Sequence, residues 1–414
     1  MSTSIDAHVL NATLPVQGLV ERGARVLWCL PERFAEHARA CGAQVMPPLH
    51  PDPLRAEPSR WTSRGAADAL VRVRSMYRDA LAAPAGDQAA QLRALVHRHG
   101  VDVLVADSLM LAAGIAAEAE GIAWASLGDG PLQWPDPDLP PFGTGLPLLA
   151  GAPGRHRNRT VRHVVDSTVF APALAELNLA RGRHGLWPVA DLLTAAVSRQ
   201  LHLQGCASGF EYPSSRRPGF VHFVGALGPG PGFAPPLPEP LRRATRTQPL
   251  AVVTQGTLRP DATELALPAA TALRREGFDV LVLGRGAVTV AERVPGTTGM
   301  AAVDLPDALS EADLLVTNGG WTTVTLALAA GVGVLQCGAT EEKADIGARI
   351  RHTGVGASLR LTRPPHWWVA RLARRVLDDP QRRQASARMA ADFAVLDARE
   401  ISARQIIALA GGRP

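Results

Sequence analysis

The stretch Asp313-Leu-Leu-Val-Thr-Asn-Gly-Gly-Trp-Thr-Thr-Val324 decides the fold class. It joins an apolar run typical of a buried strand to a glycine turn and to a helix that begins near Thr322 or Thr323. The first turn of a helix leaves backbone N–H groups without partners, and the helix dipole adds about half a positive charge there. Glycines let a phosphate approach these groups, so the stretch predicts an anion site. It is not a Walker loop, because no Gly-Lys-Ser/Thr follows, and it does not match GxGxxG.

The same alternation of strand and helix runs through the second half of the chain. Short apolar runs predict strands, and the segments between them place apolar residues at helical spacing. This order is typical of a parallel, doubly wound sheet, so the expected fold class is α/β. The expected strands are Leu250–Thr254, Asp279–Leu283, Met300–Val303, Asp313–Val316 and Gly333–Cys337, and the expected helices are Asp261–Arg275, Leu305–Glu311, Thr323–Ala330 and three that start at His366, Pro380 and Arg399.

The first half of the chain repeats this pattern, which predicts a second α/β unit. Between the halves lies the Pro- and Gly-rich stretch Leu227–Pro240, whose composition disfavours both helices and β-strands. We interpret it as a linker. We expect an N-terminal domain over 1–226, a linker over 227–249, a C-terminal domain over 250–395 and a final helix over 396–414 that crosses back to the first domain. In the first half the expected helices are His8–Arg22, Pro31–Cys41, Gln88–His99 and Ala112–Glu120, and the expected strands are Ala24–Leu30, Val101–Ala106 and Ile122–Leu127.

Length, charge and cysteine usage narrow the class of protein. The chain has 414 residues, enough for two domains, and a formal net charge of +5. Its basic residues are scattered rather than interleaved with aromatic residues, so no nucleic-acid partner is expected. Its four cysteines are far apart in the sequence, so neither a disulfide framework nor a structural zinc site is expected. Without a signal peptide or a run of about 18 apolar residues, we expect a cytoplasmic protein with no membrane span.

Two further motifs follow predicted strands of the second half. In Val253-Thr-Gln-Gly-Thr257, the bare backbone of Gly256 and the hydroxyl of Thr257 suit a phosphate, although an ordinary turn also needs such residues. In Gly338-Ala-Thr-Glu-Glu-Lys-Ala-Asp345, the charged residues can bind sugar hydroxyls, although a charged helix start would look the same. The side-chain amide of Asn318 can donate a hydrogen bond to a phosphate. Alternatively, asparagine stands here only because it suits the backbone conformation of a turn.

Together, Thr254–Leu258 and Ala312–Leu359 resemble the donor-binding half of the family 1 nucleotide-sugar glycosyltransferases. The likeness is greatest to bacterial macrolide-type, antibiotic-tailoring enzymes with the GT-B fold. Segments of the first half look like the same enzymes, among them Ala7–Leu14 and Val101–Ser108. The resemblance implies two Rossmann-like parallel-sheet domains that face each other across a cleft.

The resemblance also implies roles for individual residues. His8 matches the family's general base, and Asp107 matches the carboxylate that orients it; imidazole titrates near neutrality, which suits this work. The alternatives are a surface histidine at a frayed terminus and an aspartate that caps a helix. No metal ion and no other cofactor is expected, because a helix N-terminus and hydroxyls can stabilise the leaving diphosphate. The implied donor-binding residues are Gly256, Thr257, Asn318, Gly319, Gly320, Trp321, Thr322, Thr323, Glu342 and Lys343.

The sequence departs from the family pattern at four places. Asn318 replaces a phosphate-binding histidine, Leu326 stands where an acidic residue holds the ribose, and Lys343 replaces an amide after the carboxylate of Glu342. Family members also have an apolar strand before the histidine loop, whereas only Met1–Ala7 precede His8 here. We therefore expect either a start site upstream of Met1 or a first strand that is absent or shifted.

The sequence thus predicts an inverting glycosyltransferase for natural-product tailoring. It would transfer a sugar from a UDP- or dTDP-sugar to a hydroxyl of a small lipophilic acceptor. The alternatives are a non-catalytic protein that binds nucleotide sugars and has a degenerate base loop, and a sugar-nucleotide epimerase of similar shape. Neither the acceptor nor the oligomeric state is encoded by a motif.

Overall fold

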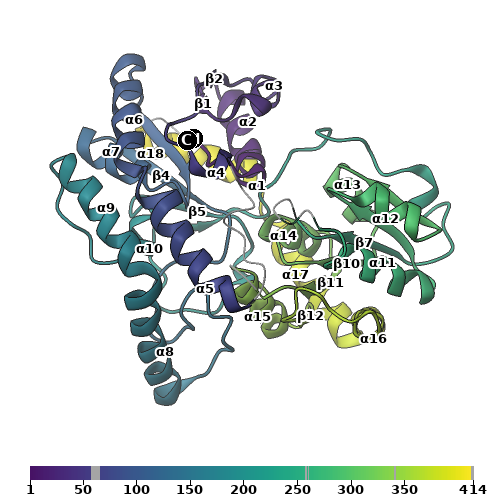
Figure 1. Ribbon diagram of the computed structural model, residues 1–414. Helices are drawn as coiled ribbons and strands as arrows, with labels where there is room; N and C mark the ends of the chain where they lie inside the picture. The colour runs from purple at the N-terminus through teal and green to yellow at the C-terminus, as the bar shows by residue number, and fades with distance from the viewer. Residues whose placement is uncertain (57–65, 257–258, 260, 340–341, 412–414) are drawn as a thin grey trace.

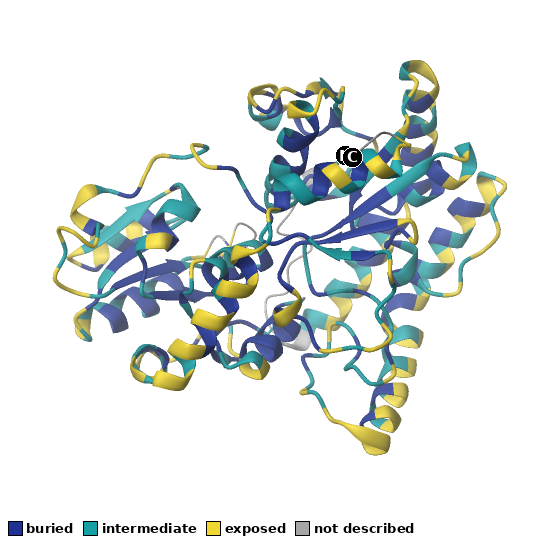
Figure 2. Cartoon of the chain, turned by 180° about the vertical axis from the view of Figure 1, so that it is seen from behind, coloured by how far each residue is buried: buried dark blue, intermediate teal, exposed yellow. Residues whose placement is uncertain are grey.

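The computed structural model describes residues 1–56, 66–256, 259, 261–339 and 342–411. The chain forms two α/β halves, each built on a parallel sheet (Figure 1). Most strand residues are buried, because helices cover the sheets (Figure 2). The expected α/β class with parallel sheets is confirmed.

The second half contains a continuous six-stranded sheet. Its strand order is β12-β11-β10-β7-β8-β9, and every pairing is parallel. Its strands are β7 (Leu250–Thr254), β8 (Asp279–Leu283), β9 (Thr297–Met300), β10 (Leu314–Thr317), β11 (Gly333–Cys337) and β12 (Gly356–Leu359). Its helices are α11 (Ala266–Arg275), α12 (Ala287–Arg293), α13 (Leu305–Glu311), α14 (Trp321–Ala329), α15 (Lys343–Thr353), α16 (His366–Asp378) and α17 (Pro380–Ala394).

One expected strand of this half is misplaced. The prediction of a strand at Met300–Val303 is wrong, since β9 ends at Met300. The register explains the end point: Met300 pairs with Leu283, the last residue of β8. The chain then turns toward Asp304, whose side chain accepts the N–H of Asp307 and caps α13.

The first half contains a four-stranded sheet and a separate two-stranded sheet. The order of the larger sheet is β3-β4-β5-β6. The strands are β1 (Leu27–Cys29), β2 (Gln44–Met46), β3 (Val103–Asp107), β4 (Ala123–Gly128), β5 (Leu201–Gln204) and β6 (Val221–Phe223). The α-helices are α1 (Asp6–Asn11), α2 (Thr13–Glu21), α3 (Ala35–Ala40), α4 (Pro53–Ala56), α5 (Ala66–Ser75), α6 (Ala85–His99), α7 (Ala112–Glu120), α8 (Gly151–Val165), α9 (Ala171–Arg183) and α10 (Leu192–Ala195).

The single helix expected at His8–Arg22 is divided into α1 and α2 at Ala12. Pro15 accounts for the break. It lacks the N–H that would bond to the carbonyl of Asn11 four residues earlier, and its ring would collide with that carbonyl. As a result His8 lies on a short helix of its own.

A gap separates the two sheets of the first half. Among the described residues, β1 pairs with β2 alone and β3 pairs with β4 alone. A cavity of about 500 Å³ lies between β1 and β3, and it is lined mainly by apolar residues of these strands and of α2, α6 and α18 (Ala398–Leu409). At one end of this cavity the Met1 amino group donates to Val105 O at 2.7 Å and Ser2 N–H donates to Cys29 O at 3.4 Å. The gap lies where an absent or shifted first strand is expected.

We expect a strand of about five apolar residues joined to Met1 to stabilise the protein. It would pair with the edges of β1 and β3 that face the cavity, and it would fill the cavity. Burial of its side chains, less the cost of ordering it, should raise the free energy of unfolding by about 2–5 kcal/mol. Denaturant unfolding of the extended protein measures this difference. A Gly/Ser extension of equal length is the control, and equal stability of both extended proteins would contradict the prediction.

The C-terminal helix α18 packs against the first half of the chain. Arg22 Nη2 lies 2.5 Å from Glu400 Oε1, and a second ion pair joins Arg399 to Glu21. A Cβ at Gly18 would lie 2.5 Å from Arg399 O, so glycine permits this close approach. The helix that the sequence predicts to cross back therefore lies against α2. The domain boundaries themselves stay a prediction.

Candidate functional site

The predicted anion site lies where neighbouring strands of the second half end. β11, β10 and β7 are adjacent and parallel, so their carboxyl ends meet at one edge of the sheet. Asn318 follows β10 directly, and its Nδ2 donates to Gln255 O, which follows β7, at 2.5 Å. A Cβ at Gly256 would lie 3.1 Å from the same Nδ2 atom. The structure thus brings Gly256 and Asn318 together.

The two glycines after Asn318 differ in backbone conformation and in the space around them. Gly319 has φ +101°, and a Cβ there would lie 2.9 Å from Gln336 Cγ and 3.0 Å from Gln336 Nε2. Gly320 has an ordinary φ of −65° and open space around it, and it is the N-cap residue of α14. No side chain of the described residues caps this helix. The backbone N–H groups of its first turn therefore remain available to an anion.

The first side chains of α14 face the other half of the protein. Trp321 Nε1 donates to Gly205 O at 2.9 Å, and Thr322 Oγ1 donates to Asn11 Oδ1 at 2.8 Å. Trp321 is buried, whereas Thr323 is half-buried. Trp321 and Thr322 can therefore serve a donor only through their backbone N–H groups.

Lys343 is the first residue of α15 and Glu342 is its N-cap residue, and both follow β11, the strand next to β10 of the predicted anion site. Lys343 Nζ lies 3.4 Å from Glu342 Oε1, and Lys343 is buried. Thr257 lies outside the described residues. Leu326 lies on α14, and its Cδ1 would be 3.2 Å from a Cβ at Gly228, which is at the start of the linker. An apolar contact with the linker thus lies at the position where the family has an acidic residue.

Two buried glutamines that sequence reasoning missed hold the donor loops. Gln336 Nε2 donates to Asn318 O at 3.1 Å and Gly338 O at 3.0 Å, and Gln336 Oε1 accepts from Ser358 Oγ at 2.6 Å. Gln255 Oε1 accepts the N–H groups at the start of α11, while its Nε2 donates to carbonyls of the preceding loop. The only sequence signal was a polar residue in or just after an apolar strand.

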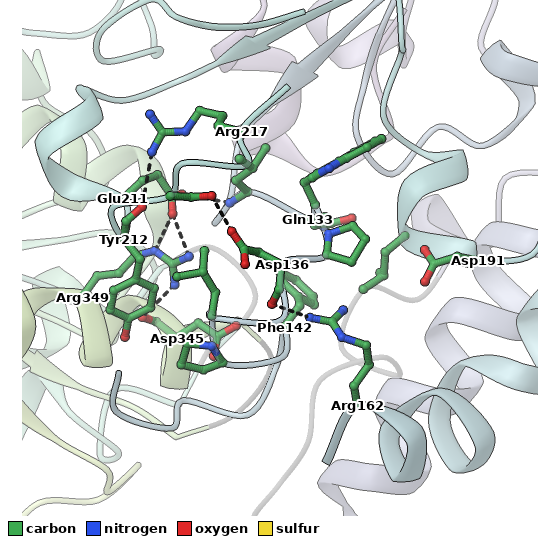
Figure 3. A pocket seen from close by; sticks show the side chains of 17 residues that line it. Gln133, Asp136, Phe142, Arg162, Asp191, Glu211, Tyr212, Arg217, Asp345 and Arg349 are labelled. Carbon is green, nitrogen blue, oxygen red and sulfur yellow. Dashed lines mark hydrogen bonds and ion pairs between the residues drawn. The ribbon is translucent and has the colours of Figure 1, made fainter. Parts of the chain in front are cut away.

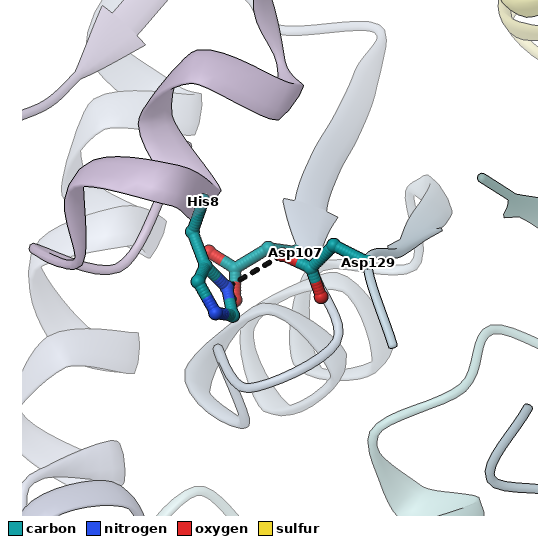
Figure 4. A group of neighbouring side chains, drawn as sticks. All are labelled: His8, Asp107 and Asp129. Carbon is teal, nitrogen blue, oxygen red and sulfur yellow. Dashed lines mark ion pairs between the residues drawn. The ribbon is translucent and has the colours of Figure 1, made fainter. Parts of the chain in front are cut away.

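The predicted base lies between two carboxylates (Figure 4). His8 Nδ1 is 3.3 Å from Asp107 Oδ1 and 2.6 Å from Asp129 Oδ2. The His8 side chain is 14 % exposed, and both carboxylates are 3 % exposed or less. The structure thus joins His8 to Asp107 as expected, and it adds Asp129, which sequence reasoning missed.

The two carboxylates change the ionisation of the histidine. Burial opposes the charged ring, but the negative charges of Asp129 and Asp107 outweigh it and hold the pKa of His8 well above its usual 6.5. Burial also opposes the charged form of Asp107. Contacts with His8 and with the N–H groups of Thr3 and Leu109 nevertheless lower the pKa of Asp107. The site therefore stabilises an imidazolium ion.

The same three side chains have ligand atoms within 4.8 Å of one another, a spacing that a divalent cation could use. However, the ring nitrogen already lies against both carboxylates, so a cation would have to displace His8 Nδ1 from them. We therefore interpret this group as a charge-stabilised histidine. That the reaction needs no metal stays a prediction.

The helix of the base contacts the helix of the anion site. His8 and Asn11 are three residues apart on α1, so they share one face of the helix. Asn11 Oδ1 accepts the hydroxyl of Thr322 in the first turn of α14. This contact brings the predicted base and the predicted anion site to one junction between the two halves.

A second polar junction surrounds a cavity of about 40 Å³ (Figure 3). Arg349 of α15 forms an ion pair of 2.7 Å with Glu211 of the first half, and both side chains are 8 % exposed or less. Asp345 accepts the N–H groups of Gly143 and Gly145, each at 2.6 Å. Charged groups that are nearly inaccessible to water thus hold the two halves together.

Replacing Arg349 with methionine is expected to lower the free energy of unfolding by about 3–5 kcal/mol, because it leaves Glu211 buried without its cation. Denaturant unfolding measures this loss. The control is the double variant Glu211→Gln with Arg349→Met, which removes both charges and should recover much of the loss. If the double variant is as unstable as the single one, the ion pair is not what stabilises the junction.

Comparisons with known proteins extend this description. No family model matches the sequence. The chain is 33 % identical over 406 residues to 4'-demethylrebeccamycin synthase of Lentzea aerocolonigenes, which covers 96 % of this chain and 95 % of the relative. It is 30 % identical over 292 residues to UDP-glycosyltransferase 2 of Phaeomoniella chlamydospora, over 66 % of this chain and 62 % of the relative.

Solved structures agree with the fold. The glycosyltransferase of kitacinnamycin superposes with a TM-score of 0.73 at 16 % identity, covering 100 % of this chain and 97 % of the other. The glycosyltransferase VinC, solved in complex with dTDP, superposes with a TM-score of 0.70 at 18 % identity, covering 99 % and 98 %. Two halves, each built on a parallel sheet, and the likeness to these structures define the GT-B fold.

This chain belongs to the nucleotide-sugar glycosyltransferases with the GT-B fold, in the antibiotic-tailoring branch. The predicted family, the fold and the transferase class of the enzyme are confirmed. Named transferases among its relatives favour this class over the auxiliary protein and the epimerase. Among the described residues, no helix is long and apolar enough to cross a membrane.

Proposed function

We propose that the protein transfers a sugar, with inversion, from a UDP- or dTDP-sugar to a hydroxyl group of a small lipophilic acceptor. The observation that carries this proposal is the Asn11–Thr322 hydrogen bond of 2.8 Å. It places the helix of His8 against the helix terminus that is suited to a diphosphate. The residue proposed to activate the acceptor and the groups proposed to bind the donor therefore lie at one junction.

In this mechanism the acceptor oxygen attacks the anomeric carbon of the sugar. The bond between that carbon and the diphosphate oxygen breaks, and the bonding electrons leave with the nucleoside diphosphate. His8 takes the hydroxyl proton on Nε2, because Nδ1 lies against the two carboxylates. The N–H groups of the first turn of α14 stabilise the negative charge of the leaving diphosphate. A single displacement of this kind inverts the anomeric centre.

The choice of donor is supported by what related proteins bind. Structures of VinC and of the spinosyn rhamnosyltransferase SpnG contain dTDP, and several relatives are named for UDP-linked transfer. SpnG is also solved with its spinosyn aglycone, which supports a natural-product acceptor. The position of Leu326 beside the linker leaves the ribose contacts of the donor to other residues.

Calorimetric titration with UDP, dTDP and, as a control, NAD tests the donor site. We expect binding of UDP or dTDP but not of NAD. The double variant Thr257→Ala with Asn318→Ala should bind the diphosphate at least about tenfold more weakly, since a lost hydrogen bond to a charged group costs about 1.5–3 kcal/mol. A folded protein that binds neither diphosphate would refute the proposal.

A further inference from the structure

We propose that Asp129 is a second positioning residue for sugar transfer and holds the ring of His8 jointly with Asp107. The proposal rests on the function proposed above for His8. It is carried by the placement of two buried carboxylates around one ring nitrogen.

The two carboxylates reach His8 from neighbouring strands. Asp107 is the last residue of β3, and Asp129 follows the last residue of β4. These strands pair in parallel, with Asp107 opposite Leu127, so both side chains emerge at the same edge of the sheet. α1 covers that edge and supplies His8 (Figure 4). The arrangement is therefore fixed by the sheet rather than by a flexible loop.

Asp107 and Asp129 differ in what else they bind. Asp107 Oδ2 accepts the N–H of Thr3 at 2.5 Å, and its Oδ1 accepts the N–H of Leu109 at 3.0 Å. Asp129 Oδ1 accepts the hydroxyl of Ser108 at 3.1 Å. Among the described residues, however, Asp129 Oδ2 has no hydrogen-bond partner, and it lies 2.6 Å from His8 Nδ1. Two buried atoms, Asp129 Oδ2 and His8 Nδ1, thus form an ion pair, and neither makes a hydrogen bond within the described part of the chain.

The shorter ion pair implies a division of tasks. Asp107 shares its charge with two backbone N–H groups and with the nearby Met1 ammonium, whereas Asp129 offers one oxygen to His8 alone. Asp129 therefore holds the ring through one short contact, while Asp107 holds it and is itself anchored by the N–H groups of Thr3 and Leu109. The charged groups facing His8 are Asp107 and Asp129, with the Met1 ammonium beyond Asp107.

This division has a consequence for pH dependence. A base must be neutral to accept a proton, so the rate should rise with pH through the raised pKa of His8. Replacing Asp129 with asparagine removes one negative charge and should shift the titration of His8 to lower pH by at least about one unit. The acid limb of the rate should move with it. The rate at the plateau should fall about tenfold, because the ring is then a weaker and less firmly held base.

NMR titration of the ring nitrogens of His8 in the full chain tests the proposal without an acceptor. The protein is labelled with 15N-histidine, and His8→Ala assigns the signal. We expect His8 to titrate well above 6.5 and to shift downward in Asp129→Asn. The matched control is Asp136→Asn, which removes a buried carboxylate that bonds to Ser214 and does not contact His8. It should leave the titration of His8 unchanged.

Each outcome bears on the proposal. A wild-type His8 that titrates near its usual value overturns it, even if no variant folds. An unchanged titration in folded Asp129→Asn also overturns it. If His8 shifts as expected but His8→Ala retains full transfer activity, the positioning by Asp129 stands and the base function fails. Rescue of the titration by Asp129→Glu supports a role for the charge itself.

Discussion

Replacement of His8 with alanine is expected to lower the turnover number for sugar transfer by about 10²–10⁴-fold, the range of general acid–base catalysis. The ring lies on the helix that contacts α14, and its two carboxylate partners stabilise the protonated form of the ring. Donor affinity should stay within about twofold, because the predicted anion site lies on α14 and not on α1. Release of nucleoside diphosphate measures the rate, and calorimetry with UDP or dTDP measures the affinity.

The control for this variant is His163→Ala. His163 is an exposed histidine on α8, which lies away from α1 and α14 (Figure 1), so its loss should not affect turnover. Full activity of folded His8→Ala would remove the proposed base. An equal loss of activity in both variants would show that the defect is not specific to the site.

Gly319→Ala is expected to weaken the binding of UDP or dTDP by at least about tenfold, since each strained backbone position costs about 1–3 kcal/mol. Gly319 has φ +101°, and a Cβ would lie 2.9 Å from Gln336 Cγ. Gln336 in turn holds the carbonyls of Asn318 and Gly338. The methyl group therefore either moves the glutamine or moves the loop that begins α14. Calorimetry measures the change in affinity.

Gly320→Ala provides a closely matched comparison. Gly320 is the next residue, has φ −65° and has open space where a Cβ would stand, so alanine fits its backbone. Donor binding by Gly320→Ala should stay within about threefold of the wild type, because the added methyl group meets no other atom and leaves the backbone N–H groups of α14 in place. If Gly319→Ala binds as tightly as Gly320→Ala, the left-handed turn is not what shapes the site.

The second half of the fold could be predicted because its local signals agree. β7, β8 and β11 have the expected bounds, since each is an apolar run buried on both faces. β12 was missed because Gly-Ala-Ser-Leu contains no β-branched or aromatic residue. Its place in the sheet depends on pairing with β11, which only the tertiary structure supplies.

The parts of the candidate site that lie in one continuous motif could be predicted from the sequence. The parts that come together only in the folded chain could not. The glycine turn and the start of α14 follow from their own residues. Asp129 stands between two glycines and looks like an ordinary turn residue in the sequence. It becomes part of the site only because β3 and β4 end side by side. Gln336 was missed for the same reason, since its partners come from three separate segments.

The gap between β1 and β3 affects the order in which the two halves of the protein unfold on heating. The second half has an uninterrupted sheet, whereas in the described part of the first half β1 and β3 do not pair with each other and lie beside a cavity of about 500 Å³. Cooperative units with fewer buried contacts open first. The first half, which carries His8, should therefore melt at a lower temperature than the half that carries α14. Over that interval the protein is expected to lose the proposed base while it still keeps the proposed nucleotide site.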